Sequence, residues 1–365
     1  MKYRITCLTP TLVGNGQRLA PIDYMVWRDQ VNVLDQNRIF KLLAKGPRLE
    51  GYLAQLRKSE KLDFASWGGF AQNFAGRRIP FEHASSSQFW NNARAENLFI
   101  PTFATGPNGK LIPGTAVKGA LRTGLVHARI GERQIKDAAS RAEESRSVRR
   151  LGPAAEDAAL GVSGKAMMRG VAPADSSSVP ESSFRIFLLR TATLEPAGAG
   201  RYQLAWKTAP RGAVRRPDDS TPAFAEMAIP GVTFEGDWQE RGAAPDALLR
   251  AGNDYSAQAL TLHRHYAETT GLTALRAAIE SLEQRIAQAR SAGNACVLPL
   301  GWGGGFLSKA AFLDTADDAY RQVLRQIAFF SRAIESRLPF PKTRRIVFLE
   351  NRPATLPGWV LFELQ

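Results

Sequence analysis

The segment from Ile112 to Leu125 (IPGTAVKGALRTGL) constrains the fold more than any other part of the sequence, because it predicts a sharp strand-to-helix turn. Pro113 disfavours helix at the residue before it, and Thr115 can accept a hydrogen bond from the first free helical amides and so act as the N-cap. At about 100° per residue, one face of this helix is apolar and the stripe beside it is basic. The apolar residues are Val117, Leu121, Gly124, Leu125 and Ala128, and the basic ones are Lys118, Arg122 and Arg129.

This helix start is suited to binding phosphate. A helix N-terminus carries roughly half a positive charge and unpaired amides, so cations one turn into the helix favour an anion there. An ordinary amphipathic surface helix with solvated cations accounts for the same pattern equally well. The rest of the chain has to decide between these two interpretations.

The charge balance favours a polyanionic partner. The 365 residues contain 48 Lys plus Arg and 34 Asp plus Glu, which gives a formal net charge of +14 and a sequence pI near 10.1. Nucleic acid is therefore the first expectation. No apolar run approaches the roughly 20 residues that span a bilayer, and the N-terminus lacks a signal-peptide core. We therefore expect no membrane partner and a cytoplasmic location.

The sequence predicts no metal or cofactor site. Cys7 and Cys296 are too few for a cysteine zinc site, and His263 and His265 would diverge on a helix. The glycine-rich segment 298–309 matches neither a Walker A loop nor a dinucleotide fingerprint. Its bare backbone would let a phosphodiester approach, with Lys309 as a point charge and Trp302 or Phe306 to stack on a base. The alternative is a structural turn whose aromatics are core, which we favour for Phe306.

Hydrophobic periodicity predicts a mixed α+β chain. We expect strands at residues 2–8, 23–27, 31–34, 98–105, 110–112, 184–194, 202–207, 223–238, 340–350 and 359–364. We expect helices from an Asp35 N-cap to about Arg57, from Thr115, over 131–150 with solvent nearly all round, over 254–290 and over 316–337. We expect an insertion at residues 59–96 and a long loop at 152–183. We also expect a basic loop tip at 211–216 that could touch RNA. A boundary within 150–183 leads us to expect domains at 1–165 and 166–365.

Three motifs in this order resemble the RAMP superfamily of CRISPR-associated proteins: LTPTLVGNG at 8–16, IPGTAVKGALRT at 112–123 and GWGGGFLSK at 301–309. Their spacing and the closing FPKTRR (340–345) and PGW (357–359) segments most resemble the fifth Csm subunits of type III-A effector complexes. The resemblance implies two ferredoxin-like, RRM-related modules with insertions. It also implies a non-catalytic subunit that binds the 3′ region of the guide RNA, caps the backbone filament and supports guide maturation and antiviral defence.

The implied partners are guide RNA, target RNA, and the backbone and small subunits of the effector complex; host nucleases are partners only in the scaffold alternative below, and no cofactor is implied. Sequence preference should be slight, because phosphates and sugars position a strand whereas base edges are needed to read it. The positions that we expect to contact RNA are Gly14, Asn15, Gly16, Arg18, Thr115, Lys118, Arg122, Trp302, Gly303, Lys309, Lys342, Arg344 and Arg345.

Two other functions stay open. Related backbone subunits cleave target RNA with an aspartate in a loop near the first strand, and Asp23 is the nearest analogue, so an endoribonuclease acting on guide or target RNA is one alternative. No histidine or carboxylate lies near Asp23 in the sequence to act as a second proton-transfer group. The other alternative is a scaffold that recruits host nucleases through exposed surfaces.

Overall fold

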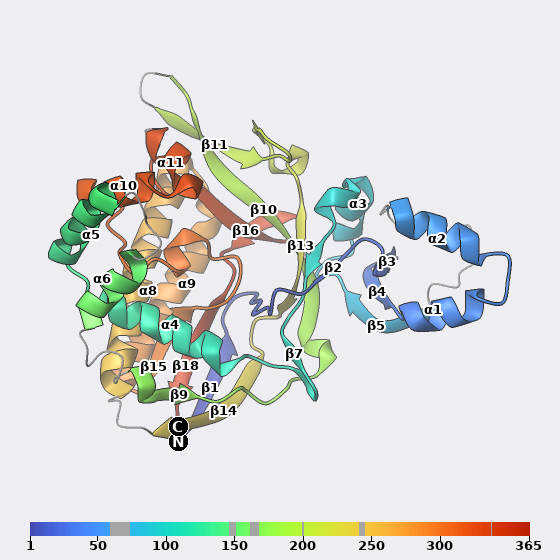
Figure 1. Cartoon of the computed structure of the whole chain (residues 1–365), viewed down its shortest axis with the longest axis horizontal. Helices are drawn as coiled ribbons and strands as arrows, with labels where there is room; N and C mark the ends of the chain where they lie inside the picture. Colours follow the sequence, from blue (N-terminus) through green and yellow to red (C-terminus); the bar gives the residue numbers. More distant parts are fainter. Residues whose placement is uncertain (59–73, 146–150, 161–167, 199–200, 241–244, 337) are drawn as a thin grey trace.

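The computed structural model describes residues 1–58, 74–145, 151–160, 168–198, 201–240, 245–336 and 338–365 (Figure 1). It is an α+β protein, as predicted, with two large antiparallel sheets in a main body and a three-stranded sheet in a lobe at its side. The termini lie side by side at one end of the body. Parts of the predicted insertion, charged helix and long loop (59–73, 146–150 and 161–167) fall outside the described residues. Within the described ranges, no helix is long and apolar enough to cross a membrane.

The first sheet has five antiparallel strands in the order β15-β18-β1-β14-β9. Its central strand β1 alternates polar and apolar residues, so Tyr3, Ile5 and Cys7 are buried on one face. Burial raises the pKa of the Cys7 thiol to about 12, so this thiol is a protonated packing group. The strands are β1 Lys2–Cys7, β9 Val171–Pro173, β14 Thr233–Glu240, β15 Ala295–Pro299 and β18 Trp359–Leu364.

The second sheet has the order β12-β11-β10-β16-β17, and β13 also pairs with β10. Strand β10 is the long apolar run that the sequence predicts from Phe184, and it organises this sheet. Its first half pairs with β13 and its second half with β11, while β16 pairs along its middle. The strands are β10 Phe184–Pro196, β11 Tyr202–Lys207, β12 Ala213–Val214, β13 Ala223–Ala228, β16 Thr343–Leu349 and β17 Arg352–Thr355.

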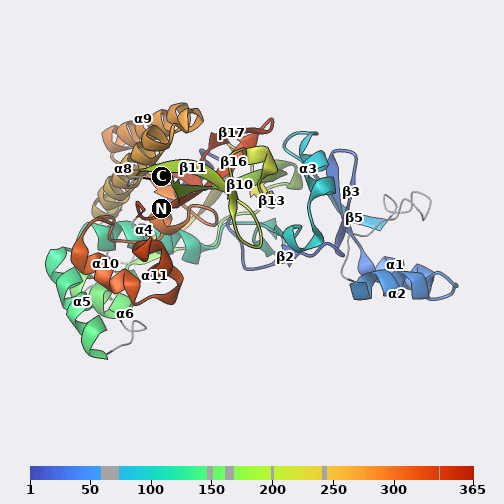
Figure 2. The ribbon, with the colours of Figure 1, turned by 90° about the horizontal axis from the view of Figure 1, so that it is seen from above.

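Three long helices pack against the first sheet, as the two views in Figures 1 and 2 show. They are α4 Gly114–His127, α8 Pro245–Thr270 and α9 Arg276–Ala292. Helices α4 and α8 cross at Gly124, whose added Cβ would lie 3.0 Å from the Gly252 Cα. Helix α8 also satisfies the free edge of β15, because Asn253 donates to the Ala295 carbonyl and Ser256 donates to the Val297 carbonyl.

The side lobe holds β3 Tyr24–Trp27, β4 Gln30–Leu34, β5 Ala75–Pro80, α1 Gln36–Leu43 and α2 Leu49–Lys58. The predicted hairpin is present, and the Asp35 carboxylate caps α1 by accepting from the Arg38 amide at 3.0 Å. The prediction of one helix to Arg57 is wrong. The helix ends at Leu43, and Gly46 and Pro47 fall in the break before α2.

Two expectations about charged or small-residue segments are also corrected. Helix α5 (Glu132–Ser145) is not solvated nearly all round, because Ile135, Ala138, Ala139 and Ala142 are buried. The predicted long loop after it contains a helix, α6 (Leu151–Leu160), that packs against α5. The helix predicted over 316–337 is split into α10 Asp318–Arg325 and α11 Ala328–Glu335.

The predicted boundary at residues 165/166 does not separate the sheets. The first sheet takes β1 from one side of it and β9, β14, β15 and β18 from the other, and both large core clusters draw on both sides. The predicted 98–112 hairpin is reduced to the two-residue ladders β6–β2 and β7–β8. The remaining elements are β2 Arg18–Leu19, β6 Ile100–Pro101, β7 Thr105–Gly106, β8 Gly109–Lys110, α3 Ser86–Asn92, and 3₁₀ turns at Ala95–Asn97, Glu181–Ser183, Pro217–Asp219, Thr273–Leu275 and Phe306–Ser308.

Candidate nucleic-acid interface

The start of α4 is capped by a carboxylate from elsewhere in the chain. The Gly114 amide donates to Asp175 Oδ1 at 2.8 Å, whereas Thr115 is exposed and its side chain caps nothing. The prediction of a Thr115 cap is therefore wrong. Only glycine fits at 114, because an added Cβ would lie 2.2 Å from the Pro173 carbonyl oxygen.

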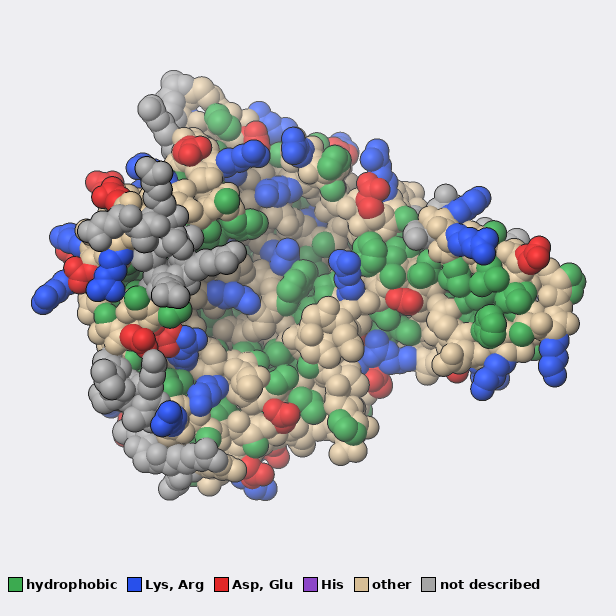
Figure 3. All heavy atoms as spheres, viewed as in Figure 1, with side chains coloured by type: hydrophobic (Ala, Val, Ile, Leu, Met, Phe, Trp, Pro, Cys, Tyr) green, Lys and Arg blue, Asp and Glu red, His purple; other side chains and the backbone are tan. Residues whose placement is uncertain are grey.

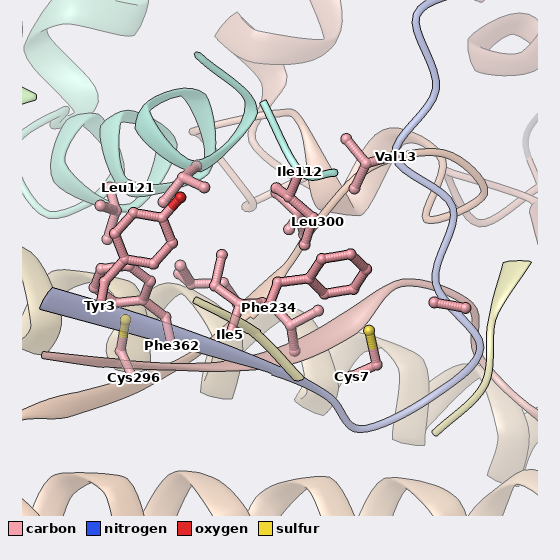
Figure 4. Close-up of a cluster of buried hydrophobic side chains, with 14 of the residues drawn as sticks. Tyr3, Ile5, Cys7, Val13, Ile112, Leu121, Phe234, Cys296, Leu300 and Phe362 are labelled. Atoms are coloured by element: carbon pink, nitrogen blue, oxygen red, sulfur yellow. The ribbon is translucent and has the colours of Figure 1, made fainter. Parts of the chain in front are cut away.

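The three sequence motifs meet in space. Leu12 and Trp302 form an isolated antiparallel bridge, with the Trp302 amide donating to the Leu12 carbonyl at 2.7 Å. Gly301 makes this contact possible: its φ is +83°, and an added Cβ would lie 2.1 Å from the Leu12 carbonyl oxygen. Figure 4 shows Val13 and Ile112, from the other two motifs, beside Leu300, which directly precedes the glycine-rich motif, in one core cluster.

Residues of all three motifs line a groove of about 730 Å³. Figure 3 shows the corresponding face of the molecule hollowed at its centre, with Lys and Arg side chains along the hollow. Its lining comes from the loop after β1, from α4, from the segment around β6, from the glycine-rich turn and from β13. The residues include Gly14, Gly16, Arg18, Phe99, Thr102, Ala223, Trp302 and Lys309.

The face of α4 that lines the groove is small and nearly uncharged. It consists of Ala116, Gly119, Ala120 and Thr123, at the spacing of one helical face. The basic stripe lies beside it: Lys118 is half-buried and does not line the groove. Arg122 pairs with Glu156 and lines a neighbouring pocket of about 400 Å³, which shares Thr123 and Lys309 with the groove. The stripe is thus next to the groove but not inside it.

The cations that do lie in the groove are Arg18 and Lys309, and both are exposed. The Arg18 guanidinium lies 4.3 Å from the centroid of the Phe99 ring, which fixes its position by a cation–π contact. Asn15 is exposed and does not line the groove. Its Oδ1 accepts from the Gln17 amide at 3.1 Å and shapes the loop.

Two predicted contact residues point inward. Gly303 is buried with φ +106°, and an added Cβ would lie 2.8 Å from Pro357 Cγ, so it serves the turn itself. The Arg344 guanidinium is buried against the Tyr266 ring and donates to the carbonyls of Pro341 and Thr343. Burial lowers the pKa of Arg344 to about 10. Neither residue is available to a strand at the surface, so neither is a candidate contact.

The other two basic residues of that segment remain partly accessible. The Arg345 guanidinium lies 4.0 Å from the Trp302 ring centroid, so it stacks on an aromatic that lines the groove. Lys342, just before β16, is half-buried. Arg18 and Lys309 line the groove, and Arg345 covers the Trp302 indole that also lines it, so cations and an aromatic platform occur together, which is the combination that binds single-stranded nucleic acid.

Asp23 lies outside the groove, at the start of the lobe. Its carboxylate Oδ2 accepts from the Ala20 amide at 2.7 Å, and its carbonyl accepts from the Leu34 amide. The residue therefore closes a turn. Among the described residues, no group of three or more His, Cys, Asp and Glu side chains could hold a metal ion.

The sequence model of the RAMP superfamily matches residues 4–241. The chain belongs to the RAMP superfamily. No curated protein sequence matches it. Two solved structures share the fold of this RAMP protein over nearly its whole length. One is a chain of a cryo-EM structure of a Csm–crRNA–target RNA ternary complex in a type III-A CRISPR-Cas system, at 17% identity, full coverage of both chains and a TM-score of 0.66. The other is the crystal structure of T. onnurineus Csm5, at 16% identity, 98% and 99% coverage and a TM-score of 0.58.

Sequence reasoning missed the uncharged side of the groove. Ala116, Gly119, Ala120 and Thr123 recur at three- and four-residue spacing, and this run of small side chains beside an apolar stripe was the available signal. Phe99, Thr102 and Ala223 carried no signal, because they reach the groove only through pairing between distant strands.

Proposed function

We propose that this RAMP protein is a non-catalytic RNA-binding subunit of a type III-A CRISPR-Cas interference complex. It would bind the 3′ region of the guide RNA and cap the backbone filament. One observation carries the proposal: the three sequence motifs, far apart in the chain, line one open groove with Arg18, Lys309 and Trp302 on its walls. The fold shared with Csm5 and with a chain of a Csm–crRNA–target RNA complex supports it.

Guide RNA, target RNA and the backbone and small subunits of such a complex are the partners that this function requires, and host nucleases are further candidates. Two interleaved ferredoxin-like modules are the architecture that we propose for it. In support, β1, α4, β9, β14 and α8 follow one another in a βαββα order within the first sheet, and the two helices pack together. The strands of the second sheet from β10 to β13 are inserted between β9 and β14.

Binding of a labelled single-stranded RNA, followed by fluorescence anisotropy over a range of salt concentrations, tests the proposal. The double variant Arg18→Ala/Lys309→Ala should weaken binding and reduce the slope of log K against log [salt] by about 1.4, because each phosphate contact to a single strand contributes roughly 0.7. The matched control is Arg276→Ala/Arg285→Ala, which removes two exposed cations from α9 on the back of the molecule in Figure 1. Equal loss in both double variants, or no binding by the wild type, would contradict the proposal.

The same RNA-binding reactions also test the nuclease alternative. The proposal predicts intact RNA on a denaturing gel, with and without divalent cations. Cleavage that disappears in Asp23→Asn, whose carboxamide oxygen can still accept from the Ala20 amide, would instead favour an endoribonuclease, and an unfolding curve of that variant would check that its stability is unchanged.

A further inference from the structure

Lys207 on β11 lies in one row with Arg345 across the second sheet. Trp206 pairs with Ala192, which in turn pairs with Arg344, and all three are buried on one face. The residues next to them, Lys207, Thr191 and Arg345, therefore point to the opposite face, since side chains alternate along a strand. Lys207 is exposed there, and Arg345 is partly exposed. The sequence pattern of β11 alone did not indicate Lys207 as a contact residue.

Lys342, just before β16, adds a third positive charge near Lys207 and Arg345. Partial desolvation over the sheet first lowers the pKa of the exposed Lys207, and the positive charges of Lys342 and Arg345 lower it further. Among the described residues, none of the three forms an ion pair with a carboxylate. Like charges held together without a counter-charge repel one another, so an anion bound between them would be favoured. We call Lys207, Lys342 and Arg345 the open basic cluster.

The open basic cluster is continuous with the groove. The Arg345 guanidinium covers one face of the Trp302 ring, and Trp302 itself lines the groove. A strand lying in the groove along Arg18 and Lys309 can therefore pass Trp302 and reach the second sheet. An indole whose one face is held by a guanidinium is a rigid platform for a nucleobase.

We propose that the open basic cluster binds a phosphate of single-stranded RNA whose neighbouring base stacks on Trp302, so that the RNA path continues from the groove onto the second sheet through Lys207. This inference rests on the proposed function and deepens it. It adds a contact residue, Lys207, that lies outside the three motifs, and a direction for the strand.

The variant Lys207→Ala tests the inference, with Arg201→Ala as its matched control. Arg201 is an exposed cation just before β11, at the opposite end of the strand from Lys207. Lys207→Ala should weaken RNA binding about tenfold, the size of one charge-assisted hydrogen bond, and reduce the salt slope by about 0.7. Arg201→Ala should change neither, and Lys207→Arg should restore most of the binding.

A second measurement separates ligand binding from a structural role. Without RNA, Lys207→Ala should have a melting temperature equal to or above that of the wild type, because it removes a repelling charge; a lower one would indicate a structural lysine and overturn the inference. Unchanged RNA affinity in Lys207→Ala, while Arg18→Ala/Lys309→Ala still weakens binding, would overturn the inference and leave the proposed function standing. If Lys207→Ala lost binding of inorganic phosphate at constant ionic strength but kept its RNA affinity, the inference would also be overturned, in favour of a site for a free anion.

Discussion

Two clusters of charged side chains in this protein differ in burial and in sign. One is largely buried and holds both cations and carboxylates, and the other is at the surface and holds cations only. In the buried charge cluster, Lys110 and Glu226 are both fully buried, and Arg77 and Glu181 complete it. Arg77 Nη1 lies 3.0 Å from Glu226 Oε1, and Lys110 Nζ lies 3.2 Å from Glu181 Oε2. The open basic cluster has cations only. The first cluster is internally neutralised and joins elements of the fold, whereas the second needs an anion from outside.

The buried charge cluster joins the lobe to the body. Arg77 lies on β5, Lys110 on β8 and Glu226 on β13, and Glu226 also accepts from the Phe103 amide at 3.2 Å. A buried pair of this kind contributes little beyond what an apolar pair would, but removal of one member leaves an uncompensated charge. The comparison therefore predicts that stability depends on the first cluster and RNA affinity on the second.

The largest expected effect is on stability. Glu226→Ala leaves Lys110 and Arg77 without their shared carboxylate, and we expect it to lower the free energy of unfolding by about 3–5 kcal/mol. Urea unfolding followed by circular dichroism measures this. The comparison fails if the loss is no greater than that of Lys207→Ala.

The pH dependence of the free energy of unfolding tests the buried charge cluster through Lys110. Burial, together with the charge of Arg77, lowers the pKa of Lys110 to about 7, while an unfolded lysine titrates near about 10.4. Between these values the unfolded chain holds a proton that the folded chain has released, so raising the pH favours folding. The free energy of unfolding of the wild type, minus that of Lys110→Met, should rise by at most about 1.4 kcal/mol per pH unit from pH 7 towards 10. A flat difference over this range would show that Lys110 keeps its proton in the cluster.

Salt should weaken RNA binding at the open basic cluster but hardly change the stability that the buried charge cluster provides. Three phosphate contacts to a single strand, one each from Arg18, Lys309 and the open basic cluster, predict roughly twentyfold weaker RNA binding at 200 mM than at 50 mM salt. The stability difference between the wild type and Glu226→Ala should stay nearly constant over the same range, because buried charges are screened much less. Parallel anisotropy and urea titrations measure both quantities, and equal salt sensitivity would remove the distinction between the clusters.

The smallest effect is expected for an exposed pair. Arg4 and Glu235 pair across β1 and β14 at 3.0 Å, but their side chains are 40% and 51% exposed. Glu235→Ala should therefore lower the free energy of unfolding by less than about 1 kcal/mol. A loss comparable to that of Glu226→Ala would mean that burial is not what separates the two kinds of pair.

The local sequence pattern predicted those elements whose conformation depends mainly on their own residues. The alternation in Lys2–Cys7, the apolar run from Phe184 and the ends of β11 and β18 were all readable from the sequence, as was the Asp35 cap of α1. The break after Leu43 was missed, although Gly46 and Pro47 mark it. The burial of α5 was missed because it depends on α6 and α10, which cover its alanines.

The sequence by itself determined the α+β class, the basic character and the three motifs that identify the superfamily. Only the tertiary structure decided which cations face the groove. Arg344 and Arg345 are neighbours in the sequence, yet strand alternation buries one against Tyr266 and sets the other on Trp302. Lys118 and Arg122 lie on a helix that does line the groove, but with its small-residue face. Which side of an element meets a ligand depends on the surfaces that the other elements already cover, and these come from parts of the chain hundreds of residues away.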